Sequence, residues 1–125
     1  MFSHVVVGTN DLQKSRQFYD SVLATLGYGP GLPREAGGYV YLGGGSFFII
    51  TPPRDGQAAT PANGGTVGFA CTSPEAVERW HAAGIANGGL SVEEPPGLRE
   101  TQFGKLYLAY MRDPDGNKLC ALHSL

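Results

Sequence analysis

The feature that most constrains this chain is a strand–helix pattern that occurs twice. A shift of 62 positions lays the first occurrence on the second without a gap, and the apolar positions and helix-stopping glycines then coincide. The aligned pairs are His4 with Thr66, Val5 with Val67, Val7 with Phe69, Phe18 with Trp80 and Gly27 with Gly89. A fixed period of this kind is typical of repeated structural units, so we interpret the chain as an internal duplication.

The first half reads as strand, helix and two further strands. Residues 4–8 are rich in β-branched residues, which favour a strand. Asn10 can cap the helix that follows, with Gln13 placed to reach back to it. An apolar stripe then continues to residue 26, and Gly27 ends the helix. Residues 39–42 and 46–51 are predicted strands, joined by three glycines.

The second half repeats this order. Residues 66–71 read as a strand, and Ser73 followed by Pro74 marks a helix start. The helix ends at the glycine pair 88–89, and residues 106–112 and 118–122 are predicted strands around a polar turn at 113–117. The segment 93–105 lacks periodicity and is expected to be a loop that borders a site.

Two strand–helix units, each followed by hairpin strands, predict an α+β fold of two βαβββ modules. The modules cover about residues 1–53 and 64–125. Residues 54–63 are polar and rich in proline, alanine and glycine, as is typical of a linker. With 125 residues the chain forms one domain, 1–125, which can bury a core without disulfides or metal.

Charge and hydropathy argue against several partners. The net charge is −2 and the cations are scattered, so we expect no nucleic-acid binding, which depends on clustered cations. No stretch approaches the ~20 apolar residues of a membrane span, and the start does not resemble a signal peptide. Cys71 and Cys120 form no metal-type or disulfide-type pair. We therefore expect a cytoplasmic protein with reduced cysteines.

Three segments of the chain stand out: FSHVVVGTNDLQKSRQFYDSVLATLGY at the start, GGTVGFACTSPEAVERWHAAGIANGG in the middle and YLAYMRDPDGNKLCAL at the end. Together they resemble the glyoxalase / bleomycin resistance / ring-cleaving dioxygenase (vicinal oxygen chelate) superfamily. The RDPDGNKL stretch, which matches the family's final hairpin, is the most specific. The resemblance implies that each module forms a half-open sheet, that the two enclose a shared cavity, and that the protein is a homodimer.

Many members of that superfamily hold a divalent metal through four side chains, taken from the first and last strands of each module. Carried over by resemblance, the positions are His4, Ile49, Thr66 and Cys120. Only His4 matches a ligand outright, and a catalytic metal needs about three protein ligands. We therefore expect no metal and no other cofactor, with a bound divalent metal as the alternative.

His4 and Cys120 are the candidate catalytic residues. His4 either orients or deprotonates a ligand, which suits the pKa of histidine, or is a buried neutral residue with one hydrogen bond. Cys120 either forms a nucleophilic pair with His4 or packs as a small apolar residue, and packing is favoured. We expect Ile49, Thr66, Leu108 and Tyr110 to line the ligand site, and His4, Tyr110 and Cys120 to share one pocket.

The resulting hypothesis is a protein that binds a small organic molecule between its modules without a tightly bound metal. The alternatives are a metal-dependent lyase, isomerase or dioxygenase of the same superfamily, and a module that binds another protein. Whether the ligand is turned over is left open at this stage.

Overall fold

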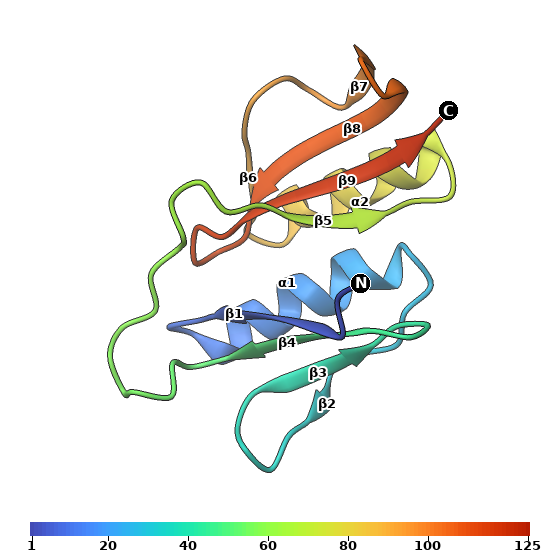
Figure 1. Cartoon of the computed structure of the whole chain (residues 1–125). Coiled ribbons are helices and arrows are strands. Elements are labelled where there is room, and N and C mark those ends of the chain that lie inside the picture. The colour runs from blue at the N-terminus through green and yellow to red at the C-terminus, as the bar shows by residue number, and fades with distance from the viewer.

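A computed structural model describes residues 1–125 and shows two modules of similar architecture (Figure 1). The first module contains β1 (His4–Gly8), α1 (Leu12–Ala24), β2 (Leu32–Pro33), β3 (Tyr39–Leu42) and β4 (Phe47–Thr51). The second contains β5 (Val67–Ala70), α2 (Pro74–Ala86), β6 (Leu90–Ser91), β7 (Gly97–Thr101), β8 (Gly104–Arg112) and β9 (Lys118–Ser124). The α+β class predicted from the sequence is confirmed.

Each module folds its strands into a separate sheet. The first sheet has the order β1-β4-β3-β2, and the second has the order β5-β9-β8-β6, with β7 paired to β8. In both, the first and last strands are parallel neighbours and the last strand is antiparallel to the one before it. The two helices have 13 residues each and are shifted by the predicted 62 positions. The two βαβββ modules are therefore present, with β7 as an addition to the second.

The structure corrects several local predictions. β2, β6 and β7 were not predicted, because two strands have only two residues and β7 lies in the segment without periodicity. Asp11, not Asn10, caps α1 by accepting a hydrogen bond from the Lys14 amide. The Asn10 side chain instead makes two hydrogen bonds to the backbone of Ala59, which hold the linker against the first module.

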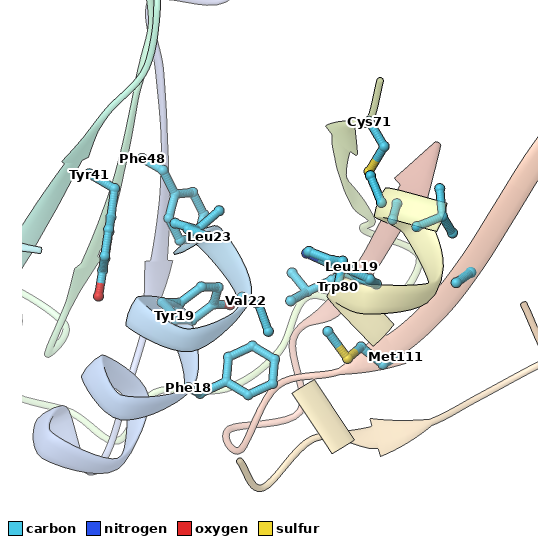
Figure 2. Close-up of a cluster of buried hydrophobic side chains, with 14 of the residues drawn as sticks. Phe18, Tyr19, Val22, Leu23, Tyr41, Phe48, Cys71, Trp80, Met111 and Leu119 are labelled. Atoms are coloured by element: carbon cyan, nitrogen blue, oxygen red, sulfur yellow. The ribbon is translucent and has the colours of Figure 1, made fainter. Parts of the chain in front are cut away.

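The two modules share one core. A cluster of 16 buried residues includes side chains from both helices and both sheets. Figure 2 shows Phe18 extending from α1 toward Met111 of the second module. Gly84 and Gly89 make room for this contact, since a Cβ at Gly84 would overlap the Met111 side chain and one at Gly89 would press on the Phe18 ring. The helices consequently pack against each other in the middle of the molecule.

This packing leaves one face of each sheet without a helix. Alternate residues of a strand point to opposite faces, and the core residues occupy one of the two sets. We call the other side of each sheet its helix-free face. It carries exposed apolar residues, among them Val6 (49%), Leu42 (60%) and Leu90 (64%). Neither helix is long and apolar enough to cross a membrane.

A buried polar contact also joins the modules. The hydroxyl of Tyr19 on α1 donates to the carboxylate of Asp113, at 2.5 Å, in the turn between β8 and β9. Asp113 is 4% exposed, and its carboxylate also accepts from Asn117 and the Asp115 amide. Burial raises the pKa of Asp113, while these hydrogen bonds lower it. The turn is thus fixed to the first helix.

Replacing Tyr19 by Phe should lower the free energy of unfolding by about 1.5–3 kcal/mol, because a buried carboxylate loses a hydrogen bond. Urea unfolding measures this. Tyr107→Phe is the matched control, since its hydroxyl also donates to a carboxylate, that of Glu78, at 2.5 Å, but in an exposed pair. It should change stability little. Equal losses in the two variants would contradict a specific role for the buried contact.

Candidate functional site

A mostly apolar cavity lies at the boundary between the modules. It has a volume of about 250 Å³. Its walls are formed by Phe2, His4, Val5, Leu23, Tyr28, Tyr41, Leu42, Gly43, Ser46, Phe47, Phe48, Val67, Gly68 and Phe69. No lysine, arginine, aspartate or glutamate is among them, whereas six of them are phenylalanine or tyrosine. We call this space the aromatic cavity.

His4 contributes an imidazole to the aromatic cavity. Its ring stacks on that of Phe47, the residue opposite it on β4, with a centroid distance of 4.9 Å and an interplanar angle of 4°. Its Nδ1 is hydrogen-bonded to the Ser3 hydroxyl at 2.7 Å. His4 is exposed, so the alternative of a buried core histidine is wrong. The ring is held at one nitrogen and one face, and its Nε2 has no partner within the chain.

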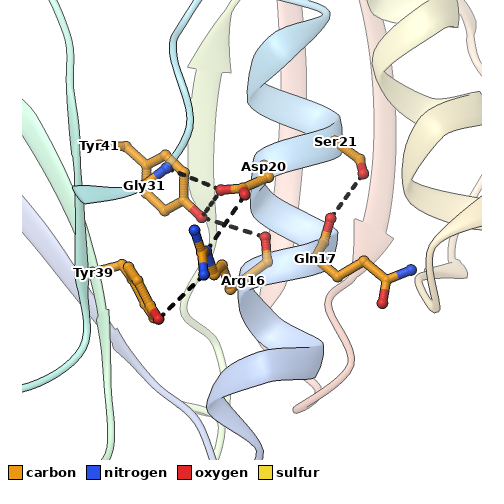
Figure 3. A network of polar contacts seen from close by, with 7 residues as sticks. All are labelled: Arg16, Gln17, Asp20, Ser21, Gly31, Tyr39 and Tyr41. Carbon is orange, nitrogen blue, oxygen red and sulfur yellow. Dashed lines mark hydrogen bonds and ion pairs between the residues drawn. The ribbon is translucent and has the colours of Figure 1, made fainter. Parts of the chain in front are cut away.

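A polar network behind the cavity fixes the Tyr41 wall. Figure 3 shows Asp20 of α1 between Tyr41, Arg16 and the Gly31 amide. The Tyr41 hydroxyl donates to Asp20 at 2.7 Å, and the Gly31 amide donates to the same oxygen. Burial and then the Asp20 carboxylate raise the pKa of Tyr41 well above its ordinary value, so its hydroxyl stays protonated. The Asp20 carboxylate thus interacts with Tyr41, Arg16 and the Gly31 amide, and it does not line the cavity.

Three residues of β5, Val67, Gly68 and Phe69, complete the cavity from the second module. Phe69 meets Phe48 edge to face across the module boundary, with a centroid distance of 5.5 Å. Gly68 precedes Phe69 on β5 and also lines the cavity. A Cβ built on Gly68 would meet no atom within 4 Å. The absence of a side chain at Gly68 keeps this part of the cavity open.

The other predicted site residues lie elsewhere. Ile49, Leu108 and Cys120 are buried, yet they are the three buried apolar residues outside the shared core. All three are on helix-free faces, Ile49 in the first sheet and the other two in the second. Thr66 is exposed and directly precedes β5. Of the six residues predicted for the site, only His4 lines the aromatic cavity.

Tyr110 and Cys120 are brought together, as opposite residues of β8 and β9. His4 also points to a helix-free face, but in the other sheet, so within one chain the three do not meet in one cavity. Burial raises the pKa of Cys120, and the neighbouring Tyr110 hydroxyl only partly opposes this. The group is therefore a protonated thiol at neutral pH. Convergence of all three residues stays a prediction.

A charged pair borders the Tyr110–Cys120 pair. The ammonium of Lys118 lies over the Tyr110 ring, 5.0 Å from its centroid, and forms a salt bridge with Glu93. Glu93 has a φ of 58°, the only positive value of a non-glycine residue in the chain. This charged group occupies the second sheet and does not reach the aromatic cavity.

The residues at the four superfamily metal positions do not fit a metal site. They offer one imidazole, one protonated thiol and one hydroxyl, and Ile49 offers no donor atom. No group of three or more histidine, cysteine, aspartate or glutamate side chains lies close enough to hold an ion. We derive no chemistry through a metal in this chain.

Sequence reasoning missed most of the cavity walls. Tyr41, Phe48 and Phe69 were expected to be ordinary strand residues, and Gly68 drew no attention. The signal that could have found the cavity was the glycine in β5, since a glycine inside a strand often marks space for a close approach.

The fold defines a class of protein built from two βαβββ modules. The sequence matches the Glyoxalase/Bleomycin resistance protein/Dioxygenase superfamily over residues 1–121, and the chain belongs to that superfamily. No curated protein matches it.

Solved structures agree with this assignment. The chain is similar to a glyoxalase/bleomycin resistance protein from Albidiferax ferrireducens T118, with 59% identity, 98% of each chain covered and a TM-score of 0.95. A family enzyme from Burkholderia phytofirmans PsJN shares 20% identity over 98% of each chain, with a TM-score of 0.74. A lactoylglutathione lyase from Agrobacterium tumefaciens shares 18% identity over 98% of this chain and 92% of its own, with a TM-score of 0.67. The last two show the fold alone.

Proposed function

We propose that this protein binds a small organic molecule in the aromatic cavity. The observation that carries the proposal is a cavity of about 250 Å³ at the module boundary, with apolar walls and one fixed imidazole. Ligand sites are typically concave, mostly apolar and equipped with few polar groups. The cavity differs from the predicted one in its walls, since it shares only His4 with the predicted set.

A substitution at Gly68 that fills the cavity tests this proposal. In Gly68→Leu the new side chain should fill the cavity, because the position is open and its backbone is not left-handed. Binding of indole and of cyclohexanol, followed by NMR titration, should weaken at least tenfold for whichever compound binds the native protein. Ala70→Leu is the matched control, since Ala70 is exposed on the same face of β5 and does not line the cavity.

Two outcomes would contradict the proposal. One is that neither indole nor cyclohexanol binds the native protein. The other is that Gly68→Leu binds them as the native protein does while its melting temperature and spectrum show an intact fold. Equal weakening in Gly68→Leu and Ala70→Leu would place the ligand elsewhere on β5 and would also count against the cavity.

We further propose that binding needs no tightly held metal, on the ground of the unsuitable donor set described above. Protein purified without an affinity tag should contain well under one equivalent of iron, manganese, nickel or zinc, as measured by elemental analysis. Extensive dialysis against a chelator should leave ligand affinity unchanged. A stoichiometric metal whose removal abolishes binding, and whose return restores it, would overturn this proposal and favour the metal-dependent alternative.

We also propose that the protein is a homodimer in which a second copy covers the helix-free faces. Exposed apolar residues on both faces support this, because such patches are uncommon on monomers. Light scattering should give a dimer for the native protein and a monomer for Val6→Glu and Leu90→Glu. Ile85→Glu is the control, since Ile85 is an exposed apolar residue on α2, away from both faces. A monomeric native protein would refute the dimer.

A further inference from the structure

We propose that Asn63 is a site of spontaneous deamidation, in which the backbone nitrogen of Gly64 attacks the Asn63 side chain and the linker gains an isoaspartate. The site does not line the aromatic cavity and does not depend on its ligand. The inference rests on a comparison within the chain, because the tetrapeptide ANGG occurs twice, at residues 62–65 and 86–89. The two copies have the same local sequence, so a difference in their reactivity has to come from their surroundings.

The reaction uses only the chain and water. The backbone nitrogen of the residue after an asparagine bonds to the asparagine Cγ, and the side-chain nitrogen leaves as ammonia together with the proton of the attacking nitrogen. Water then opens the resulting five-membered succinimide ring at one of its two carbonyls, which gives isoaspartate or aspartate. A following glycine favours the attack, because it has no Cβ to obstruct its own nitrogen and its backbone rotates freely.

The first copy is exposed and loosely held. Residues 62–65 are all exposed, and one turn hydrogen bond spans them, from the Gly65 amide to the Ala62 carbonyl at 3.1 Å. The Gly64 amide donates no hydrogen bond within the chain. Gly64 has a φ of 93°, and a Cβ there would meet no atom within 4 Å. The attacking nitrogen is therefore free, in a segment with open space around it.

Asn63 also differs from the other three asparagines of the chain in having a free side chain. The side chains of Asn10, Asn87 and Asn117 each make two hydrogen bonds. The Asn63 side chain makes none within the chain, so its Cγ can turn toward the Gly64 nitrogen without breaking a contact.

The second copy is fixed at the end of α2. The Asn87 and Gly89 amides both donate to the Gly84 carbonyl, at 3.1 and 2.8 Å. The Asn87 side-chain nitrogen donates to the Ala83 carbonyl at 2.8 Å, and its oxygen accepts from Gln17 of α1 at 3.5 Å. Both the backbone and the side chain of Asn87 are thus held where the two helices meet.

Local opening sets the rate of deamidation in the folded protein, because the glycine nitrogen reaches Cγ only after the backbone rotates. Exposed segments with few packed contacts open at little cost in free energy, whereas segments tied to the core open rarely. One exposed hydrogen bond opposes the rotation at residues 62–65, and the four bonds at Asn87 and Gly89 oppose it at residues 86–89. Asn63 therefore deamidates first.

The test measures both copies in one sample. Trypsin, which cleaves after lysine and arginine, separates them, because Asn63 lies between Arg54 and Arg79 and Asn87 lies between Arg79 and Arg99. The intact native protein is kept at mildly alkaline pH, and digests taken over time are analysed by mass spectrometry for the gain of one dalton. We expect Asn63 to deamidate at least tenfold faster than Asn87. In guanidinium chloride the two rates should become equal.

The role of Gly64 is isolated by Gly64→Ala, in which the new methyl group obstructs the attacking nitrogen. Deamidation of Asn63 should slow at least fivefold in this variant. Gly45→Ala is the matched control, since Gly45 is also exposed, has a φ of 97° and has no neighbour within 4 Å of a built Cβ, but does not follow an asparagine. It should leave the Asn63 rate unchanged, and melting temperatures check that both variants fold.

Three results would overturn the proposal. One is equal deamidation of Asn63 and Asn87 in the folded protein. Another is an Asn63 peptide that stays unchanged for as long as the chain in guanidinium chloride needs to react. The third is a deamidated Asn63 peptide that protein isoaspartyl methyltransferase does not methylate, because direct hydrolysis of the side chain yields aspartate alone. Methylation of that peptide would support attack by Gly64.

Discussion

The close approach of Phe18 and Met111 to two glycines is the contact on which the rest of the structure depends. Gly84 and Gly89 carry no side chain where these residues pack, so α1 and α2 can approach each other and both sheets share one core. The helices then cover one side of each sheet and leave the other side free. The aromatic cavity follows from the same arrangement, because it lies where β1 and β4 of one module meet β5 of the other.

Much of the fold could be predicted because its signals are local. The shift of 62 positions reflects two helices of equal length that start at equivalent points. β7 was not predicted because it pairs with the adjacent half of β8, and a hairpin of this kind needs no buried apolar stripe. The cap at Asp11 was not predicted because asparagine and aspartate are equally good caps. Only the contact of the Asn10 side chain with Ala59 decides between the two residues.

The site was harder to predict because its geometry depends on how two sheets are placed, which no residue pattern encodes. His4 and Cys120, which were predicted to share one pocket, both lie on helix-free faces. Strand alternation could not show that these faces belong to sheets that do not enclose one space within a single chain. The residues that do surround His4 come from both sides of β4 and from the start of β5, so they cannot share one parity.

Comparison of the two modules suggests why the cavity is free of charge. Strand pairing makes Val6 equivalent to Gly68 and Phe47 equivalent to Lys118, since each occupies the same place relative to the parallel pair of its module. In the first module the residue opposite His4 is therefore an aromatic ring, which stacks on it. In the second module the equivalent position is a cation, but it lies over Tyr110 and is paired with Glu93 on the far side of β9 from β5. The two modules thus contribute differently to the boundary, because the first presents most of the rings and the imidazole. The second contributes Val67, Gly68 and Phe69, and its Lys118 is paired with Glu93.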